Sequence, residues 1–504
     1  MKTKLISIAA VAALVNSVSV FAVNSDQTAK DLSVRTNALE SQVHLLKAQI
    51  DQLQTKNKNQ KVKVSAAQDN EQDNKPPTQT YEDLSKEQKL DILLAQAAHR
   101  PFIVSSPVFG MRRPDDAYSE LMTNLSSMNE DLVLLKLRKK MDNYAKEHGI
   151  PFATRPVISL SGGLEAQVDY RSHDKYQPAA QSDISLSKAE LDIIVEAGSW
   201  TDGAMIISYD DESASYTDNI SKINNSTLYI NRAWITLGKL NKTPFYFTVG
   251  QVFAPFGSFS SNMLTSPATK TLGRTKDRMA VFGYSGANGL YAQIYGLDGS
   301  TKPNGGEFIR HTGANIGHRF ETENFALNIG AGVLGNLAES EGMQNKLFAV
   351  TKLINNPEKI NSRVFGLDGY LKATFFKKYN LMAEYVGASN NFNSADLMFN
   401  GVGAKPQAYS VEGSMLFKTL SKPSSVYAAF GGSAQALALN VAKQYWAAGY
   451  TVSPTKYAIT TLEYRHDINY EWTDQTSSGA RIAPVTSIPG RHNNRVTVQL
   501  GLYF

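Results

Sequence analysis

The sequence lacks cysteine entirely over its 504 residues. We therefore expect no disulfide framework, no thiolate metal site and no lipid-attachment cysteine of the lipoprotein kind. Long hydrophobic runs are missing too: no segment approaches the roughly 18 apolar residues of a membrane helix. With a mean hydropathy of −0.28, this excludes a helical membrane protein. The net charge of +5 is small and dispersed, so we expect no nucleic-acid partner.

Signatures of catalysis are scarce. The chain has no Gly-x-Ser-x-Gly elbow and no His-Glu-x-x-His motif. The dipeptide His466-Asp467 and the pair His311 and His318 are the suggestive histidines, and we interpret them as ordinary loop or lumen residues. Gly330 to Gly335 matches the dinucleotide-binding spacing, but that motif needs a strand-turn-helix setting, so we interpret it as small residues in a strand. We expect no enzyme, no cofactor and no metal site.

The two ends of the chain indicate export to an outer membrane. Lys2 and Lys4 precede a short apolar run and the small-residue pattern ending at Ala22, which predicts a signal peptide over 1–22. At the other end, residues 496–504 alternate strictly, and their large apolar side chains need an apolar solvent on one face. This predicts the final strand of an outer-membrane β-barrel in a Gram-negative cell, facing lipid. The C-terminal signal for the barrel-assembly machinery would be Leu500, Leu502 and Phe504.

Residues 23–54 carry four heptads with leucine at every d position. This pattern predicts a short parallel coiled coil and hence a homo-oligomer, a trimer or a dimer. A lone amphipathic helix docked on its own barrel is the alternative. The predicted interface residues are Leu32, Leu39, Val43, Leu46, Ile50 and Leu53.

Two segments separate the heptads from the strands. Residues 55–114 begin with a stretch rich in Lys, Asn, Gln and Asp and form the predicted polar linker. In residues 115–150, apolar side chains repeat at helical spacing from Tyr118 to Leu135, before Gly149 and Pro151 end the pattern. We interpret this second segment as a periplasmic helix that packs on itself or on a partner. The alternative is a plug inside the barrel.

Residues 156–504 form the predicted barrel. From Val157 onward, segments of about ten residues alternate with period two, as in residues 190–197. Sixteen such segments are joined by short turns and long loops in strict alternation, which predicts an all-β antiparallel transmembrane barrel; fourteen or eighteen strands stay open. Tyrosines at the expected strand ends, among them Tyr246, Tyr295 and Tyr385, predict interfacial aromatic girdles.

The third long loop is the candidate binding element. It runs from Phe253 to Arg278 and ends in four cations with a single acid, Asp277. If the loop folds into the lumen, these cations would concentrate anionic solutes at the narrowest point; an exposed loop that meets acidic lipopolysaccharide is the alternative. The candidate ligand-binding residues are Lys270, Arg274, Lys276 and Arg278.

The order of these parts resembles the siderophore porins typified by the receptor for legiobactin. The resemblance rests on the heptads from Leu32 to Leu53, the polar linker, the strand Arg232 to Gly238 running into Val249 to Gly257, and the Tyr503-Phe504 ending. It implies a barrel of about sixteen strands that takes up a ferric carboxylate siderophore without a TonB-type plug. No binding residue is carried over from the family.

Two other functions stay open at the level of sequence. One is a general or anion-preferring diffusion porin, trimeric through its heptads. The other is a structural surface protein that links the outer membrane to the cell wall through its N-terminal region.

Overall fold

The computed structural model describes residues 103–105, 128–147, 156–172, 181–210, 227–300, 309–344, 360–455, 457–471, 473–478 and 492–504. The chain divides into two compact units, Met1–Thr78 and Gln79–Phe504, and all described residues belong to the second. The predicted signal peptide and the predicted coiled coil with its six interface residues lie outside the described residues, as do most of the linker and residues 115–127.

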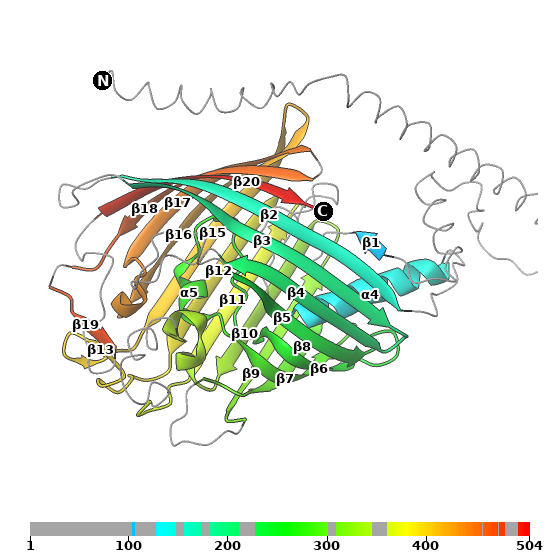
Figure 1. The fold of residues 1–504 in the computed structure, drawn as a ribbon, viewed down its shortest axis with the longest axis horizontal. Helices are drawn as coiled ribbons and strands as arrows, with labels where there is room; N and C mark the ends of the chain where they lie inside the picture. The colour runs from blue at the N-terminus through cyan, green and yellow to red at the C-terminus, as the bar shows by residue number, and fades with distance from the viewer. Residues whose placement is uncertain are drawn as a thin grey trace, which may run out of the picture. The chain divides into compact units, whose positions relative to one another are not determined.

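The described residues build a closed barrel of 16 antiparallel strands, as predicted (Figure 1). Each barrel strand pairs with the next along the chain, and the last returns to the first with Gly163 opposite Tyr503 and Arg171 opposite Arg495. The strands are β2 (Val157–Arg171), β3 (Gln181–Ala197), β4 (Thr201–Asp210), β5 (Thr227–Gly238), β6 (Phe245–Phe253), β7 (Lys276–Ser285), β8 (Leu290–Leu297), β9 (His311–Glu321), β10 (Phe325–Leu334), β11 (Gly366–Phe375), β12 (Tyr379–Ala388), β15 (Gln407–Thr419), β16 (Lys422–Ala434), β17 (Gln444–Thr455), β18 (Ala458–Ile468) and β20 (His492–Tyr503).

Short turns and long connections alternate around the barrel. The turn between β15 and β16 consists of Leu420 and Ser421, both with positive φ (48° and 65°). Two positive φ values match the twist of the flanking strands. Because short turns face the periplasm in such barrels, both ends of the barrel chain lie on the periplasmic side.

The outward face of the barrel is apolar. Alternate residues of each strand point out, and on this face large hydrophobic side chains are exposed, whereas a soluble protein would bury them. Leu500 and Leu502 are 58% and 47% exposed and lie on this face, so they meet lipid as predicted. Their role as an assembly signal stays a prediction. The barrel therefore sits in the outer membrane. Its lipid-facing residues include Leu164, Ile235, Phe247, Val249, Phe282, Ile294, Ile316, Leu381, Trp446 and Leu462.

Several short elements accompany the barrel. β1 (Ile103–Ser105) pairs in parallel with residues 158–160 of β2, just past the end of β20. β13 (Leu397–Phe399), β14 (Val402–Gly403) and β19 (Thr476–Ser478) form a small separate sheet from two long loops. The helical elements are α4 (Glu130–Glu147), α5 (Ala268–Gly273), η3 (Leu337–Glu339) and η4 (Leu437–Leu439). No described helix has the length and apolarity needed to span a membrane.

Tyrosines on the inward face lie over glycines of neighbouring strands. The girdle prediction is therefore wrong for Tyr246 and Tyr295, which are buried in the lumen, whereas Tyr385 is 45% exposed on the outward face. A side chain on the glycine would collide with the tyrosine ring; a Cβ on Gly330 would lie 2.4 Å from Cζ of Tyr370. This explains the glycine-rich sequence of β10 without any nucleotide. The pairs are Tyr246 with Gly283, Tyr291 with Gly317, Tyr295 with Gly313, Tyr370 with Gly330, Tyr427 with Gly449 and Tyr445 with Gly431.

Candidate functional site in the barrel lumen

The connection between β6 and β7, residues 254–275, folds into the lumen and contains α5 (Figure 1); we call it the constriction loop. It reaches the opposite wall, where three inward-facing glutamates, Glu384 of β12, Glu412 of β15 and Glu463 of β18, accept hydrogen bonds from it. The sequence left open whether this loop folds inward, and these contacts decide it.

Each glutamate holds a different part of the loop. The Glu384 carboxylate accepts from the backbone N–H groups of Ser258 (2.6 Å) and Phe259 (2.8 Å) and from the Thr269 hydroxyl (2.8 Å). Hydrogen bonds to a charged acceptor each contribute about 1.5–3 kcal/mol, so the loop is firmly anchored. The remaining anchors are Ser261 and Asn262 on Glu412, and Leu264 and Thr265 on Glu463, at 2.6–3.1 Å.

Two of the four predicted cations, Lys270 and Arg274, lie on the constriction loop, and Lys276, at the start of β7, joins Arg274 through Glu341. Lys270 and Arg274 lie one turn apart on and just after α5, and Arg274 pairs with Glu341 at 2.5 Å. Lys276 Nζ lies 3.7 Å from the same carboxylate and donates to Asn231 Oδ1 at 2.7 Å. Lys270 forms no ion pair within the described ranges. Arg278 is exposed and shares the outward face of β7 with Phe282, so it is not a lumen residue.

Three cations lie near one aromatic ring, that of Phe253. Phe253, at the end of β6, has the guanidinium carbons of Arg274 and Arg232 at 4.9 and 5.3 Å from its centroid and Lys276 Nζ at 6.0 Å. A phenyl face attracts cations without neutralising them. The cluster therefore keeps its positive charge except where Glu341 and the wall acids offset it.

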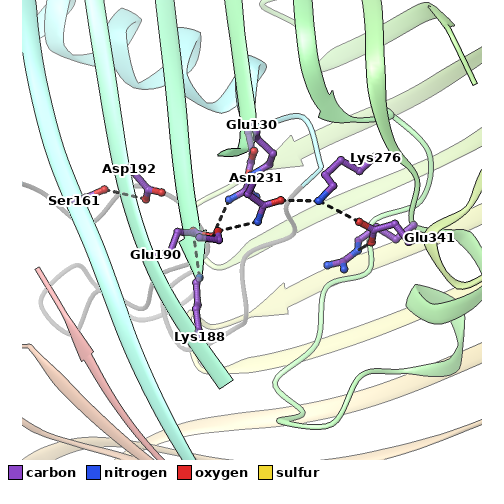
Figure 2. A network of polar contacts seen from close by, with 11 residues as sticks. Glu130, Ser161, Lys188, Glu190, Asp192, Asn231, Lys276 and Glu341 are labelled. Atoms are coloured by element: carbon purple, nitrogen blue, oxygen red, sulfur yellow. Dashed lines mark hydrogen bonds and ion pairs between the residues drawn. The ribbon is translucent and has the colours of Figure 1, made fainter. Parts of the chain in front are cut away.

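A chain of polar contacts extends this cluster along the wall of β3 to β5 (Figure 2). Arg232 Nη2 lies 3.2 Å from Glu190 Oε2, and Lys188 lies 3.5 Å from the other oxygen of Glu190. Asp192 accepts from Ser161 at 3.1 Å. The role of Arg232 was not predicted from the sequence, although Arg232 begins the strand motif that ends at Gly238. Its inward direction depends on the strand register, which shifts between Ile206 and Ile207 of β4.

α4 lies against the inside of the barrel. Glu130 Oε1 pairs with Arg232 at 2.6 Å, and Asp131 Oδ2 accepts from the Thr248 hydroxyl at 2.7 Å. Arg138 pairs with Asp202 near the β3–β4 turn. Arg232, Thr248 and Asp202 are buried on the inward faces of β5, β6 and β4. A helix packing on itself or on a partner was therefore the wrong interpretation for residues 128–138; their contacts are with the lumen wall.

The sequence of α4 explains its place and direction. Leu132 and Leu135 pack with the inward-facing Tyr246 and Tyr291 in one buried cluster. Acidic residues occupy the first turn and Lys146 the last, as the helix dipole favours. The acidic start meets Arg232 within the lumen, while Arg138 donates to the carbonyl oxygen of Gly198 at a periplasmic turn. The helix therefore runs from the lumen toward the periplasm.

Charge on the constriction loop depends on its surroundings. Burial and, next, the neighbouring charge of Arg274 lower the pKa of the Lys270 amine to about 7. Lys270 therefore changes charge near neutral pH. In the part of the chain that the structure describes, no group of three metal-ligating side chains gathers.

Comparison with known proteins identifies the family. No protein-family model matches the chain. A UPF0422 protein of Coxiella burnetii is 32% identical over 476 residues, covering 92% of this chain and 93% of that protein. A UPF0422 protein of Legionella pneumophila is 33% identical over 420 residues, with 80% and 76% covered. The chain belongs to the UPF0422 family. Because the alignment spans nearly the whole UPF0422 chain of Coxiella, it includes the N-terminal region as well as the barrel.

Solved structures similar to this UPF0422 protein include a porin and an outer-membrane channel. An anion-selective porin from Comamonas acidovorans has a TM-score of 0.46 at 10% identity, covering 69% of this chain and 100% of the porin. The channel DcaP of Acinetobacter baumannii has a TM-score of 0.44 at 12% identity, with 69% and 98% covered. Both TM-scores are below 0.5, so the barrel fold rests on the strand pairing described above.

Proposed function

We propose that this UPF0422 protein is a passive outer-membrane channel for an anionic solute, and that the solute is a ferric carboxylate siderophore. The observation that carries the proposal is the constriction loop, which lies in the lumen with Lys270, Arg274 and Lys276 on or beside it. Arg232 adds a guanidinium from the wall. Carboxylate groups of the solute would be drawn by these charges and accept hydrogen bonds from them, and the protein would bind no iron directly.

The siderophore itself is supported by the resemblance of the parts to siderophore porins and not by any contact in the lumen. Bilayer recording tests it: single-channel current would be measured with ferric citrate, with phosphate and with a neutral sugar. Within each opening, we expect ferric citrate to interrupt the current at a lower concentration than phosphate or the sugar does. Current that is indifferent to ferric citrate would contradict the proposal.

The second candidate is a general diffusion porin. It is favoured by the acids of the lumen, because Glu341 offsets both Arg274 and Lys276, and Glu384, Glu412 and Glu463 add carboxylates on the far wall. A trimer or dimer through the heptads remains a prediction in either case. Attachment to the cell wall, the third hypothesis, rests on residues 23–150, of which the structure describes few; failure of that segment to co-sediment with peptidoglycan would exclude it.

Neutralising the loop is expected to abolish any preference for anions. In the variant with Lys270→Gln and Arg274→Gln, the chloride-to-potassium permeability ratio should fall by about a factor of two or more, since fixed charges at a constriction set selectivity. Reversal potentials in a salt gradient measure this ratio. Arg278→Gln is the matched control, because Arg278 lies on the outward face. A ratio that changes equally in both variants would contradict the assignment.

Anion preference is also expected to depend on pH. Lys270, with a pKa of about 7, is protonated below neutral pH and uncharged above it. The chloride-to-potassium ratio should therefore decrease between pH 6 and pH 8.5, as measured by reversal potentials. Lys270→Arg keeps its charge throughout and should give a flat profile. A flat profile in the parent protein would show that Lys270 does not titrate in this range.

A further inference from the structure

We propose that Arg232 and its lumen neighbours form a carboxylate-binding site which Glu130 of α4 occupies in the closed channel, so that α4 is a built-in plug that a polycarboxylate solute displaces. The inference rests on the proposed anion uptake and goes beyond it, because it assigns a gate and the group that opens it.

α4 fills space in the lumen that a solute needs. An α-helix with its side chains is about 10–12 Å across, and this one packs Leu132 and Leu135 onto the inward face of the barrel. The constriction loop occupies the same lumen from the other side. Together, α4 and the constriction loop leave a narrower lumen than the constriction loop would leave alone.

Glu130 is bound as the carboxylate of a ligand would be. Its Oε1 lies 2.6 Å from Arg232 Nη1, and Arg232 is held from below by Glu190 at 3.2 Å. An arginine fixed by one carboxylate and presenting its remaining donors to another is a common carboxylate site. Figure 2 shows Glu130 approaching this site from α4, above Glu190 of the wall.

The contact between Glu130 and Arg232 is electrostatically strained. Three carboxylates, Glu130, Glu190 and Asp192, gather around two cations, Lys188 and Arg232. Within the described structure, Glu130 Oε2 and Asp192 Oδ1 are buried without a hydrogen-bond partner, which is costly. If α4 leaves, Arg232 keeps Glu190 as its partner. Release therefore leaves the charge of Arg232 paired, unlike the rupture of an isolated buried ion pair, while Asp202 of the wall loses its ion pair with Arg138.

A polycarboxylate can make contacts that Glu130 cannot. Arg232, Arg274 and Lys276 all lie within 4.9–6.0 Å of the Phe253 ring centroid. A solute with several carboxylates spans two of these cations at once, and its second contact is then intramolecular and strengthened accordingly. A single glutamate side chain has one carboxylate, so such a solute competes well for Arg232. The uptake solute would thus open its own path.

The experiment follows the burial of α4 with a thiol reagent. The chain has no cysteine, so a single engineered thiol is the only one present. Leu132→Cys is buried against the wall at 4% exposure in the parent and should react slowly in the refolded full-length protein. Citrate, used as the probe, should accelerate labelling by about tenfold or more, as expected for a shifted two-state equilibrium. Val133→Cys, on the 44% exposed side of the same helix, controls for reagent access.

Two further variants make the test decisive. With Glu130→Ala added, Leu132→Cys should react quickly without citrate, and the open probability in bilayers should rise. With Asp142→Ala instead, on the same helix, where Asp142 accepts a hydrogen bond from the exposed Asn241, labelling should stay slow and citrate-sensitive. Asp131→Cys with Thr248→Cys, whose parent side chains touch, should lock the channel shut until a reductant is added.

Slow labelling in the Glu130→Ala background would overturn the plug. Labelling that Glu130→Ala accelerates but citrate does not would overturn the carboxylate displacement. Either result could occur while the loop variants still show anion selectivity, so failure here is separate from failure of the proposed function.

Discussion

Replacing Glu384 and Glu412 together by alanine is expected to raise the single-channel conductance about threefold or more, since a 16-stranded barrel without an inward loop encloses a wide aqueous channel. The two substitutions remove six hydrogen bonds to the constriction loop. They also leave the backbone N–H groups of Ser258, Phe259 and Asn262 without acceptors. Each lost bond to a carboxylate costs about 1.5–3 kcal/mol. We expect the sum of these losses to exceed the free energy that holds the loop in its inward position.

Conductance steps in planar bilayers measure this effect directly. Glu323→Ala is the matched control, because Glu323 is exposed in the turn between β9 and β10. The barrel should stay folded in all variants, which the heat-dependent mobility of the refolded protein in gels reports. An unchanged conductance in a folded double variant would mean that the glutamates do not hold the constriction.

Gly283→Val is expected to be the most destabilising single substitution considered for the barrel wall, by about 2 kcal/mol, a typical cost of overpacking a closely packed site. A Cβ on Gly283 would lie 2.1 Å from Cζ of Tyr246. The tyrosine ring must then leave its position, where its hydroxyl accepts from Gln293 at 3.2 Å. Because the same ring packs against Leu132 and Leu135, α4 should loosen as well.

The shift of the denaturant midpoint, followed by tryptophan fluorescence of the refolded protein, measures the loss. Gly413→Val is the control: a Cβ at Gly413 meets no atom within 4 Å, and it points outward toward lipid. We expect that variant to keep the parent midpoint. Equal midpoints for Gly283→Val and the parent would show that Tyr246 can relocate without cost.

The constriction loop and α4 should be separable in a single recording. The loop narrows the open pore, so its anchors set the size of each conductance step. α4 blocks or leaves the lumen, so its contacts with Arg232 set how often steps occur. A variant that changes step size with unchanged open probability therefore reports on the loop, and the reverse reports on the helix.

The barrel was predictable because the pattern that determines each strand lies within that strand's own residues. Alternation within segments such as 190–197, with Leu191 and Val195 outward and Asp192 and Ile194 inward, fixes both faces of a strand. Short and long connections then order sixteen strands without any knowledge of distant contacts. The outward hydrophobic face of β20 follows from the same period of two.

The contents of the lumen were decided by tertiary structure alone. Thr265 meets Glu463 across 198 positions of sequence, and Glu130 meets Arg232 across 102; neither pair has a local pattern that predicts it. Arg278 shows what the sequence pattern could not predict. It is a cation of the predicted loop, but the register of β7 directs its side chain outward. The sequence thus determined a lipid-facing barrel through residues that respond to solvent on each side. Closure of that barrel brought distant charges together inside it, and only their pairing in space determines which cations a solute can reach.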